Sequence, residues 1–305
     1  TTEIYTLSLH DALPILPIVI VYALVNRPYM LDLSPKRSFI RSLLSQGMDI
    51  YLIDWKDPAR SIPKPTLENY IEKNINEAAR WITKEHEIPN INMLGICQGG
   101  TFSLMYTALH QKLVKNLITM VTPLDFSAGC NLFKHLSKYY ETDKISETFN
   151  ALPGDLMNMG FLQLKPFELL VGKYSDLSQI FEDPEKSDMF LRMEKWIFDS
   201  PAQSGPAWHK FIRDCYQKNS LIKNEMELGE EKIILSNITC PILNITAEKD
   251  HLVPLEASKA IEKAISSTDY TYLNFNTGHI GIFVSGMSNQ KIAPEIAKWI
   301  KAKSE

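Results

Sequence analysis

The sequence predicts an α/β fold built on a mostly parallel sheet. Short apolar runs rich in Val, Ile and Leu alternate with segments of helical periodicity, which is the pattern of strand–helix–strand units. A glycine-rich turn also joins one such strand directly to a helix. The chain has 305 residues, enough for one large domain or for a core that carries an insertion.

The first part of the chain supplies two strands and two helices. Ile18–Val25 is a continuous apolar run, as expected of a strand that is buried on both faces. Ser34-Pro35 predicts the start of a helix, and Ile50–Ile53 is the next strand. Thr66–His86 places apolar residues at helical spacing, which predicts a long amphipathic helix.

Two further strands flank the glycine-rich turn. Ile91–Leu94 is the strand that enters the turn, and Thr101–His110 continues as the helix that leaves it. Leu117–Val121 is another buried strand. The alternation resumes late in the chain, with a strand, a helix, a strand and a closing amphipathic helix over Pro241–Ala247, Leu255–Ile265, Tyr270–Phe275 and Gln290–Lys303.

The middle of the chain breaks this rhythm. From about residue 128 to 237 strand signals largely vanish, and Met, aromatic and Lys/Glu-rich stretches take their place. An insertion of roughly a hundred residues has the size of a small domain. We therefore expect an α/β core from residues 16–127 and 238–305, with a helical cap insertion over 128–237.

The first fifteen residues have a different character. Thr1 to Ile15 match one reading frame of a sequencing-library adapter along their whole length. We interpret residues 1–15 as a non-native segment, expect natural sequence to start near Leu16, and exclude His10 and Asp11 from catalysis.

Composition narrows the function classes. The net charge of −4 gives no basic footprint, which argues against nucleic acid as a partner. The longest uncharged apolar run, Ala12–Val25, is shorter than the ~20 residues that span a bilayer. Four cysteines without a paired framework indicate a reducing, cytoplasmic setting, with Cys130, Cys215 and Cys240 as packing residues.

The remaining cysteine, Cys97, lies in the motif Gly95-x-Cys97-x-Gly99. This is the spacing of a nucleophile elbow, a strained strand-to-helix turn that exposes a nucleophile and needs small flanking residues. Both the strand and the helix that the motif requires are present. The alternative is a buried structural cysteine beside a turn.

A nucleophilic cysteine needs a base, and the base needs an orienting group. On this architecture the order along the chain is nucleophile, acid, histidine. Asp250 follows one late strand and His279 follows the next, so we predict a Cys97–His279–Asp250 triad. Gly278 permits the turn that directs the histidine toward the elbow.

Other titratable residues compete less well. His251, Glu248 and Asp125 lie in loops where a catalytic group could stand, and we weigh them as minor candidates. The other histidines fall on helix surfaces or in the insertion, and we expect solvated or structural roles for His86, His110, His135 and His209.

Acyl transfer also needs two N–H donors for the developing oxyanion. We predict the backbone N–H of Gln98, the residue after the nucleophile, and one from the loop near Val25-Asn26-Arg27, assigned to Val25. A thiolate suits thioester substrates, and a thioester intermediate keeps the acyl group activated for another acceptor. Cysteine in place of serine therefore favours an acyltransferase over a hydrolase.

The sequence resembles the polyhydroxyalkanoate synthases. Gly95–Gly100 looks like that family's lipase-like box, and Tyr22–Leu33 and Tyr51–Trp55 resemble its first core segments. Thr246–Pro254 and Gly278–Gly281 match its acid and histidine motifs. The likeness covers nearly everything from Leu16 onward and is greatest for the two-component class, although the family's N-terminal segment is replaced by adapter-like residues.

The resemblance implies an α/β-hydrolase fold and a reaction. (R)-3-hydroxyacyl-CoA, short-chain and of the 3-hydroxybutyryl type, would be polymerised with release of CoA, and Cys97 would hold the growing chain. His279 would activate Cys97, while Asp250 would either orient His279 or help deprotonate the substrate 3-hydroxyl. No metal or cofactor is implied. A second synthase subunit, a homo-oligomer and location at cytoplasmic polyester granules are also implied.

Two other hypotheses about the function remain open. A cysteine hydrolase of the dienelactone hydrolase or thioesterase type shares the elbow but would be shorter, without a hundred-residue cap. A non-catalytic granule-associated protein on the same fold would have no need of the three triad residues in order.

Overall fold

The computed structural model describes residues 3–7, 16–129, 132–164, 166–167, 171–175 and 177–303. Its centre is a sheet of order β1-β5-β2-β6-β7-β12-β13, in which all pairs except β1 with β5 are parallel. The parallel strands are β2 (Pro17–Val21), β5 (Asp49–Asp54), β6 (Ile91–Ile96), β7 (Val114–Met120), β12 (Ile242–Ala247) and β13 (Tyr270–Phe275). The predicted mostly parallel α/β fold is confirmed.

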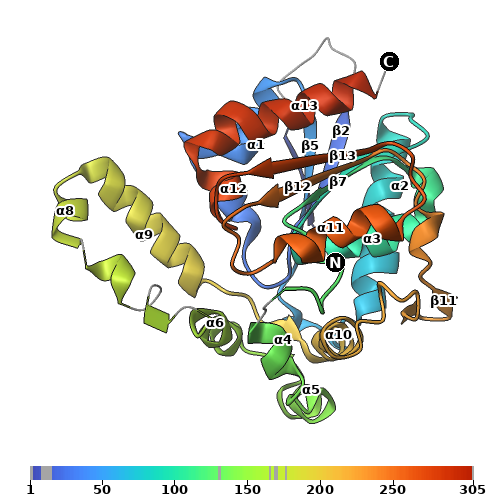
Figure 1. Cartoon of the computed structure of the whole chain (residues 1–305), viewed down its shortest axis with the longest axis horizontal. Helices are drawn as coiled ribbons and strands as arrows, with labels where there is room; N and C mark the ends of the chain where they lie inside the picture. Colours follow the sequence, from blue (N-terminus) through green and yellow to red (C-terminus); the bar gives the residue numbers. More distant parts are fainter. Residues whose placement is uncertain are drawn as a thin grey trace.

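Helices cover both faces of the sheet (Figure 1). Alternate residues of a strand point to opposite faces, so Ile18 and Ile20 belong to one core cluster and Val19 and Val21 to the other. One face packs on α1 (Phe39–Ser45), α12 (Gly281–Val284), η8 (Ser288–Ile292) and α13 (Ala293–Ala302). The other packs on η3 (Asn69–Ile75), α2 (Asn76–Glu85), α3 (Gln98–His110) and α11 (Leu255–Ala264).

Two parts of the N-terminal region differ from expectation. Ser34-Pro35 does not start a helix: β3 (Asp32–Ser34) turns back on β4 (Arg37–Ser38), and α1 starts only at Phe39. The prediction failed because Ser38, four residues later, is the better cap; its hydroxyl accepts a hydrogen bond from the Arg41 amide at 2.9 Å.

The backbone of β1 (Glu3–Leu7) forms an antiparallel edge strand on β5. No such strand is predicted from the sequence, because residues 1–15 are interpreted there as a non-native segment. Residues 8–15, including His10 and Asp11, lie outside the described residues, so their interpretation stays a prediction. Short connecting turns complete the core at η1 (Pro28–Leu31), η2 (Pro58–Arg60) and η4 (Gln111–Leu113).

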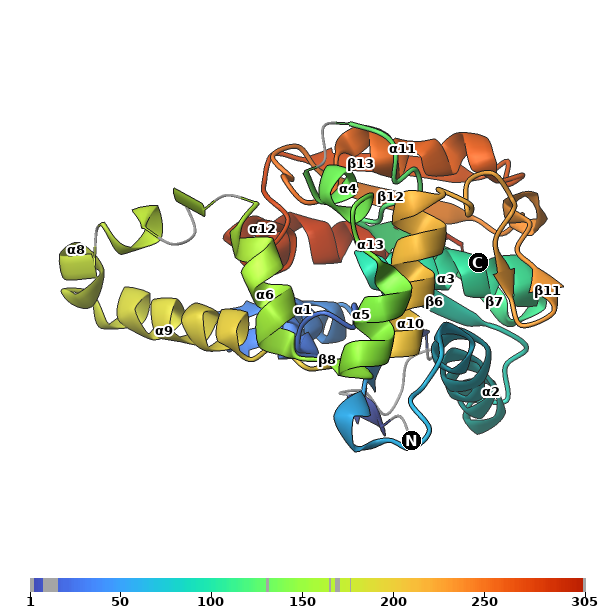
Figure 2. The ribbon, with the colours of Figure 1, turned by 90° about the horizontal axis from the view of Figure 1, so that it is seen from below.

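Residues 128–237, here called the cap segment, connect β7 to β12. The helices among its described residues are α4 (Leu132–Ser137), α5 (Thr142–Phe149), α6 (Gly154–Leu162), η5 (Gly172–Tyr174), α8 (Leu177–Phe181), α9 (Pro184–Phe198), α10 (Gly205–Phe211), η6 (Ile212–Gln217) and η7 (Leu235–Asn237). Two short strand pairs join them, β8 (Ala151–Leu152) with β9 (Gln203–Ser204) and β10 (Glu227–Leu228) with β11 (Glu231–Lys232). Figures 1 and 2 both show α8 and α9 extending away from the sheet, whereas α10 lies against the core.

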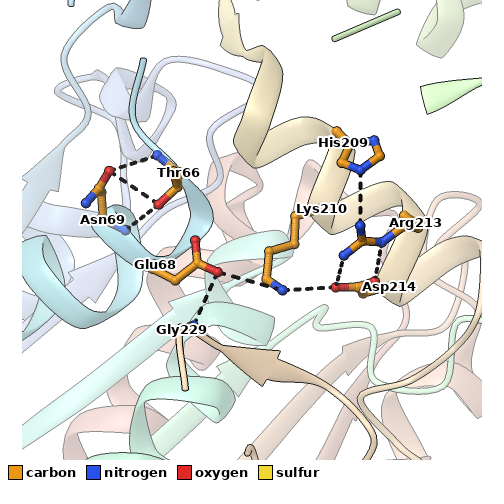
Figure 3. Close-up of polar contacts among 8 residues, drawn as sticks. All are labelled: Thr66, Glu68, Asn69, His209, Lys210, Arg213, Asp214 and Gly229. Carbon is orange, nitrogen blue, oxygen red and sulfur yellow. Dashed lines mark hydrogen bonds and ion pairs between the residues drawn. The ribbon is translucent and has the colours of Figure 1, made fainter. Parts of the chain in front are cut away.

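A charged cluster fixes α10 and η6 to the core (Figure 3). The Lys210 ammonium lies 3.2 Å from an Asp214 carboxylate oxygen and 3.7 Å from Glu68, which precedes η3. Burial raises the pKa of Asp214, but its bonds with Arg213 and the charge of Lys210 outweigh burial and lower it. Glu68 also accepts the Gly229 amide, so three separate segments meet at one ion pair.

Replacing Lys210 tests this attachment. Lys210→Met keeps the length of the side chain but leaves two carboxylates without their shared cation. We expect a loss of about 1–3 kcal/mol in the free energy of unfolding, between the values typical of exposed and buried pairs. Urea unfolding measures it. Lys144→Met, which removes an exposed pair with Glu141, is the control and should change stability far less; equal effects would contradict the assignment.

Candidate active site

Cys97 occupies the turn between β6 and α3 in a strained backbone conformation. Its φ of 54° and ψ of −122° are unusual for a residue with a side chain. The turn is held from both sides, because the Cys97 amide donates to the Met120 carbonyl at 2.9 Å and the Gly100 amide donates to the Cys97 carbonyl at 2.9 Å. The side chain is therefore presented at the carboxyl end of the sheet by a fixed backbone.

The glycines of the motif are required by close packing. A Cβ atom on Gly99 would lie 2.1 Å from the Val21 carbonyl oxygen, and one on Gly95 would lie 2.4 Å from the Gly100 Cα. One on Gly100 would come within 1.8 Å of the Thr122 hydroxyl. Any side chain at these positions would push α3 away from β2, β6 or the residues after β7.

Asp250 lies in the loop after β12, and both of its carboxylate oxygens are used. Oδ1 accepts hydrogen bonds from the amides of Leu252 at 2.8 Å and Val253 at 2.9 Å. Oδ2 lies 2.7 Å from Nδ1 of His279, and the Asp250 side chain is only 1% exposed. The carboxylate is thus directed at one imidazole nitrogen and is closed to solvent.

His279 lies in the loop after β13 and connects the acid to the nucleophile. Burial lowers its pKa, but the charges of Asp250 and Cys97 and the hydrogen bonds with both side chains outweigh burial and raise it to about 10. The imidazole is therefore positively charged at neutral pH and connects the Asp250 carboxylate to the Cys97 side chain. The structure brings together the three side chains that the sequence analysis grouped.

The raised pKa gives a stability prediction with a definite sign. The ordinary value is 6.5 and the folded value is about 10, so the stabilisation is complete below pH 6.5 and is lost as the pH rises through 10. We expect the free energy of unfolding to fall more steeply over this window in the wild-type chain than in His279→Gln. Urea titrations at several pH values measure it, and parallel profiles of the two proteins would contradict a charged His279.

Both residues predicted for the oxyanion hole, Gln98 and Val25, line the same cavity as Cys97. The Gln98 amide is at the first position of α3, where helical N–H groups lack partners within the helix. The Gln98 side chain has a role that sequence reasoning missed: its Oε1 accepts the Leu24 amide at 3.0 Å. This bond fixes the loop that carries Val25 against the elbow. The two N–H donors themselves stay a prediction.

The minor acid candidates are placed differently from Asp250. Glu248 is exposed, and Asp125 accepts hydrogen bonds from Ser127 and from Asn219 at 2.8 Å.

The histidines outside the triad have separate surroundings. His251 lines the cavity beside the triad. His86, His110 and His209 bond to Tyr51, Glu72 and Arg213, and His135 lies on α4.

Two of the other cysteines, Cys215 and Cys240, do not line the cavity. Cys215 and Cys240 are buried, and burial raises the pKa of both thiols. Cys130 lies outside the described residues.

The triad opens into a cavity of about 280 Å³ between the core and the cap segment. The walls are mainly apolar, with Met, Leu, Ile and aromatic side chains from both sides. The cap segment contributes Phe133, Met157, Phe161, Met193, Trp196, Trp208, Phe211 and Tyr216, among others. Such walls fit an acyl chain better than a charged ligand.

None of the helices in the described ranges is long and apolar enough to cross a bilayer. Within the same ranges, no group of three or more His, Cys, Asp and Glu side chains is arranged to hold a metal ion.

Solved structures share the fold at low sequence identity. A putative non-heme bromoperoxidase from Mycobacterium tuberculosis H37Rv has a TM-score of 0.62 and 12% identity, and the match covers 99% of this chain and 96% of that one. A monoacylglycerol lipase from Paleococcus ferrophilus has a TM-score of 0.60 and 14% identity, covering 99% of each chain. At these identities the likeness establishes the fold alone.

Sequence comparison identifies the family. The α/β hydrolase fold family matches residues 17–285. Poly(3-hydroxyalkanoate) polymerase subunit PhaC from Allochromatium vinosum is 48% identical over 290 residues, which cover 95% of this chain and 81% of that protein. The subunit of the same name from Synechocystis sp. is 44% identical over 300 residues, covering 95% and 78%. The chain therefore belongs to the poly(3-hydroxyalkanoate) polymerase family, acyltransferase enzymes built on the α/β-hydrolase fold.

Proposed function

We propose that this chain polymerises (R)-3-hydroxyacyl-CoA into polyhydroxyalkanoate, with release of CoA, through a thioester on Cys97. The observation that carries the proposal is the chain of contacts from Asp250 to His279 to Cys97 at the wall of an apolar cavity. We propose 3-hydroxybutyryl-CoA as the substrate for the first test, because short acyl chains are what the sequence resemblance implies.

The first half-reaction loads the enzyme. The Cys97 sulfur attacks the thioester carbonyl, the carbonyl oxygen takes up negative charge, and the backbone N–H groups of Gln98 and Val25 stabilise it. The carbon–sulfur bond to CoA then breaks, and His279 gives its proton to the departing CoA thiolate. One thioester is exchanged for another, so the acyl group stays activated.

The second half-reaction extends the polymer. The 3-hydroxyl oxygen of one acyl unit attacks the carbonyl of the acyl group on Cys97, and neutral His279 accepts the hydroxyl proton. An ester bond forms and the Cys97 thioester breaks, which returns the sulfur and the charged imidazole to their starting state. Water must be kept from the same carbonyl, and the apolar walls of the cavity serve this purpose.

We assign Asp250 the orienting role rather than contact with the substrate. Two backbone amides fill Oδ1, His279 contacts Oδ2, and the side chain is only 1% exposed, so a substrate hydroxyl has no open path to the carboxylate. Asp250 instead holds the proton on Nδ1 and leaves Nε2 of His279 to exchange protons with sulfur and substrate.

We propose that the chain works with a second synthase subunit, forms homo-oligomers, and acts at cytoplasmic polyester granules, on the strength of its similarity to proteins named polymerase subunits. Co-purification with the second subunit from cells that express both, followed by size measurement, tests the first two points.

One assay separates this function from its competitors. The purified chain is incubated with (R)-3-hydroxybutyryl-CoA, with and without the second subunit, while CoA release and polymer turbidity are followed. Release of CoA together with turbidity supports the polymerase. Release of CoA with only free hydroxy acid would support a hydrolase, and no release in either condition would support a non-catalytic protein.

A further inference from the structure

Two tyrosines stand in the mainly apolar wall of the Cys97 cavity. Tyr22 follows β2 directly, and Tyr216 belongs to η6 in the cap segment, so the two come from opposite sides of the cavity. The triad mechanism proposed above uses neither of them.

Tyr22 is fixed beside the elbow. Its backbone carbonyl accepts the Trp55 indole N–H at 2.8 Å, and a Cβ on Gly99 would lie 2.8 Å from its carbonyl carbon. The residue is only 4% exposed, and it lines the cavity.

Tyr216 is held by an aromatic cluster. Its ring centroid lies 4.7 Å from that of Phe126 and 4.9 Å from that of Phe133, both in edge-to-face geometry. Within the described residues, neither the Tyr22 nor the Tyr216 hydroxyl has a hydrogen-bond partner, whereas Tyr29, Tyr106 and Tyr174 all donate to side-chain oxygens. The two hydroxyls are thus free to bind a substrate atom.

Both tyrosines line the same cavity as Cys97. Burial is the larger cause that raises the pKa of Tyr22 and of Tyr216, and negative charge at Cys97 is the second. The phenols therefore stay protonated and serve as hydrogen-bond donors in the electrostatic field of Cys97.

We infer that the hydroxyls of Tyr22 and Tyr216 bind the oxygen on carbon 3 of the acyl group attached to Cys97. The inference rests on the proposed function and extends it. The carbonyl oxygen of that group has its own proposed donors, the N–H groups of Gln98 and Val25, which leaves the carbon 3 oxygen as the next polar atom along the chain. The tyrosines would thereby select 3-oxygenated acyl groups over plain fatty acyl groups.

The test compares two thioesters that differ in one atom. Single-turnover CoA release is measured with (R)-3-hydroxybutyryl-CoA and with butyryl-CoA, in the presence of the second subunit. We expect the wild-type chain to prefer the hydroxylated substrate, and Tyr22→Phe and Tyr216→Phe each to lower this preference roughly three- to tenfold, the worth of one neutral hydrogen bond. Rates with butyryl-CoA should change little, which separates lost recognition from lost nucleophilicity.

Tyr70→Phe is the matched control. Tyr70 is also 4% exposed and its hydroxyl also bonds to no described residue, but it packs on Trp55 and does not line the Cys97 cavity. The Tyr70→Phe variant should prefer (R)-3-hydroxybutyryl-CoA over butyryl-CoA as strongly as the wild-type chain does. An unchanged preference in both Tyr22→Phe and Tyr216→Phe, or an equal loss in Tyr70→Phe, would overturn the inference.

A binding measurement keeps the test informative without turnover. In the Cys97→Ala background, calorimetry gives the affinities for the same two thioesters. Recognition by the tyrosines predicts tighter binding of the hydroxylated one, and loss of that difference in the two Phe variants. If the wild-type chain releases no CoA while this difference persists, the polymerase proposal fails and the recognition inference stands.

Discussion

Cys97→Ala is expected to abolish CoA release, with a fall in turnover of about 10⁴-fold or more, because removal of a nucleophile eliminates the covalent route. The strained backbone of the elbow is held by main-chain hydrogen bonds that alanine retains, so the fold should persist. The measurement is the initial rate of CoA release from (R)-3-hydroxybutyryl-CoA. Circular dichroism and urea unfolding confirm that the variant is folded.

Cys240→Ala is the control for cysteine loss in general. Cys240 is buried, 8% exposed, and lies away from the cavity. We expect near wild-type turnover from it at a modest cost in stability. Substantial polymer synthesis by Cys97→Ala would refute the nucleophile assignment.

Asp250→Asn is expected to slow loading and elongation by the same factor, about 10³–10⁴-fold. The amide keeps the shape of the side chain but can present an N–H to Nδ1 of His279, which favours the wrong tautomer. Because the carboxylate orients His279 in both half-reactions, both rates should suffer equally. Rapid-quench kinetics resolve the first burst of CoA from the steady growth of polymer.

The alternative role predicts a different pattern. If Asp250 deprotonated the substrate 3-hydroxyl, loading would survive and elongation alone would collapse. A variant with a normal burst and no polymer growth would therefore contradict the orienting role. His279→Gln serves as the comparison, since loss of the imidazole should impair both steps.

Much of the site could be predicted because its determinants are local. The spacing Gly95-x-Cys97-x-Gly99 records two close backbone approaches, at 2.4 Å and 2.1 Å from a hypothetical Cβ, and a sequence motif captures such constraints directly. Asp250 and His279 could be placed because parallel strands all end at one edge of the sheet, so loops after successive strands meet there.

The missed features depend on contacts between distant segments. The Gln98 side chain bonds Leu24, 74 residues away, and no local signal marks that partner. Tyr22 and Tyr216 meet at one cavity only because the cap segment folds back over the elbow, and a tyrosine in an apolar stretch resembles any core aromatic. The hairpin at Ser34-Pro35 is a local exception, since a competing cap at Ser38 lies only four residues further on.

The most direct test of the central claim is to trap the acyl group. The chain is mixed with (R)-3-hydroxybutyryl-CoA in the presence of the second subunit, quenched in acid within the first turnover, digested, and analysed by mass spectrometry. The account predicts a hydroxybutyryl adduct on the peptide that contains Cys97 and on no other cysteine peptide. CoA release without that adduct, or an adduct on another residue, would contradict it.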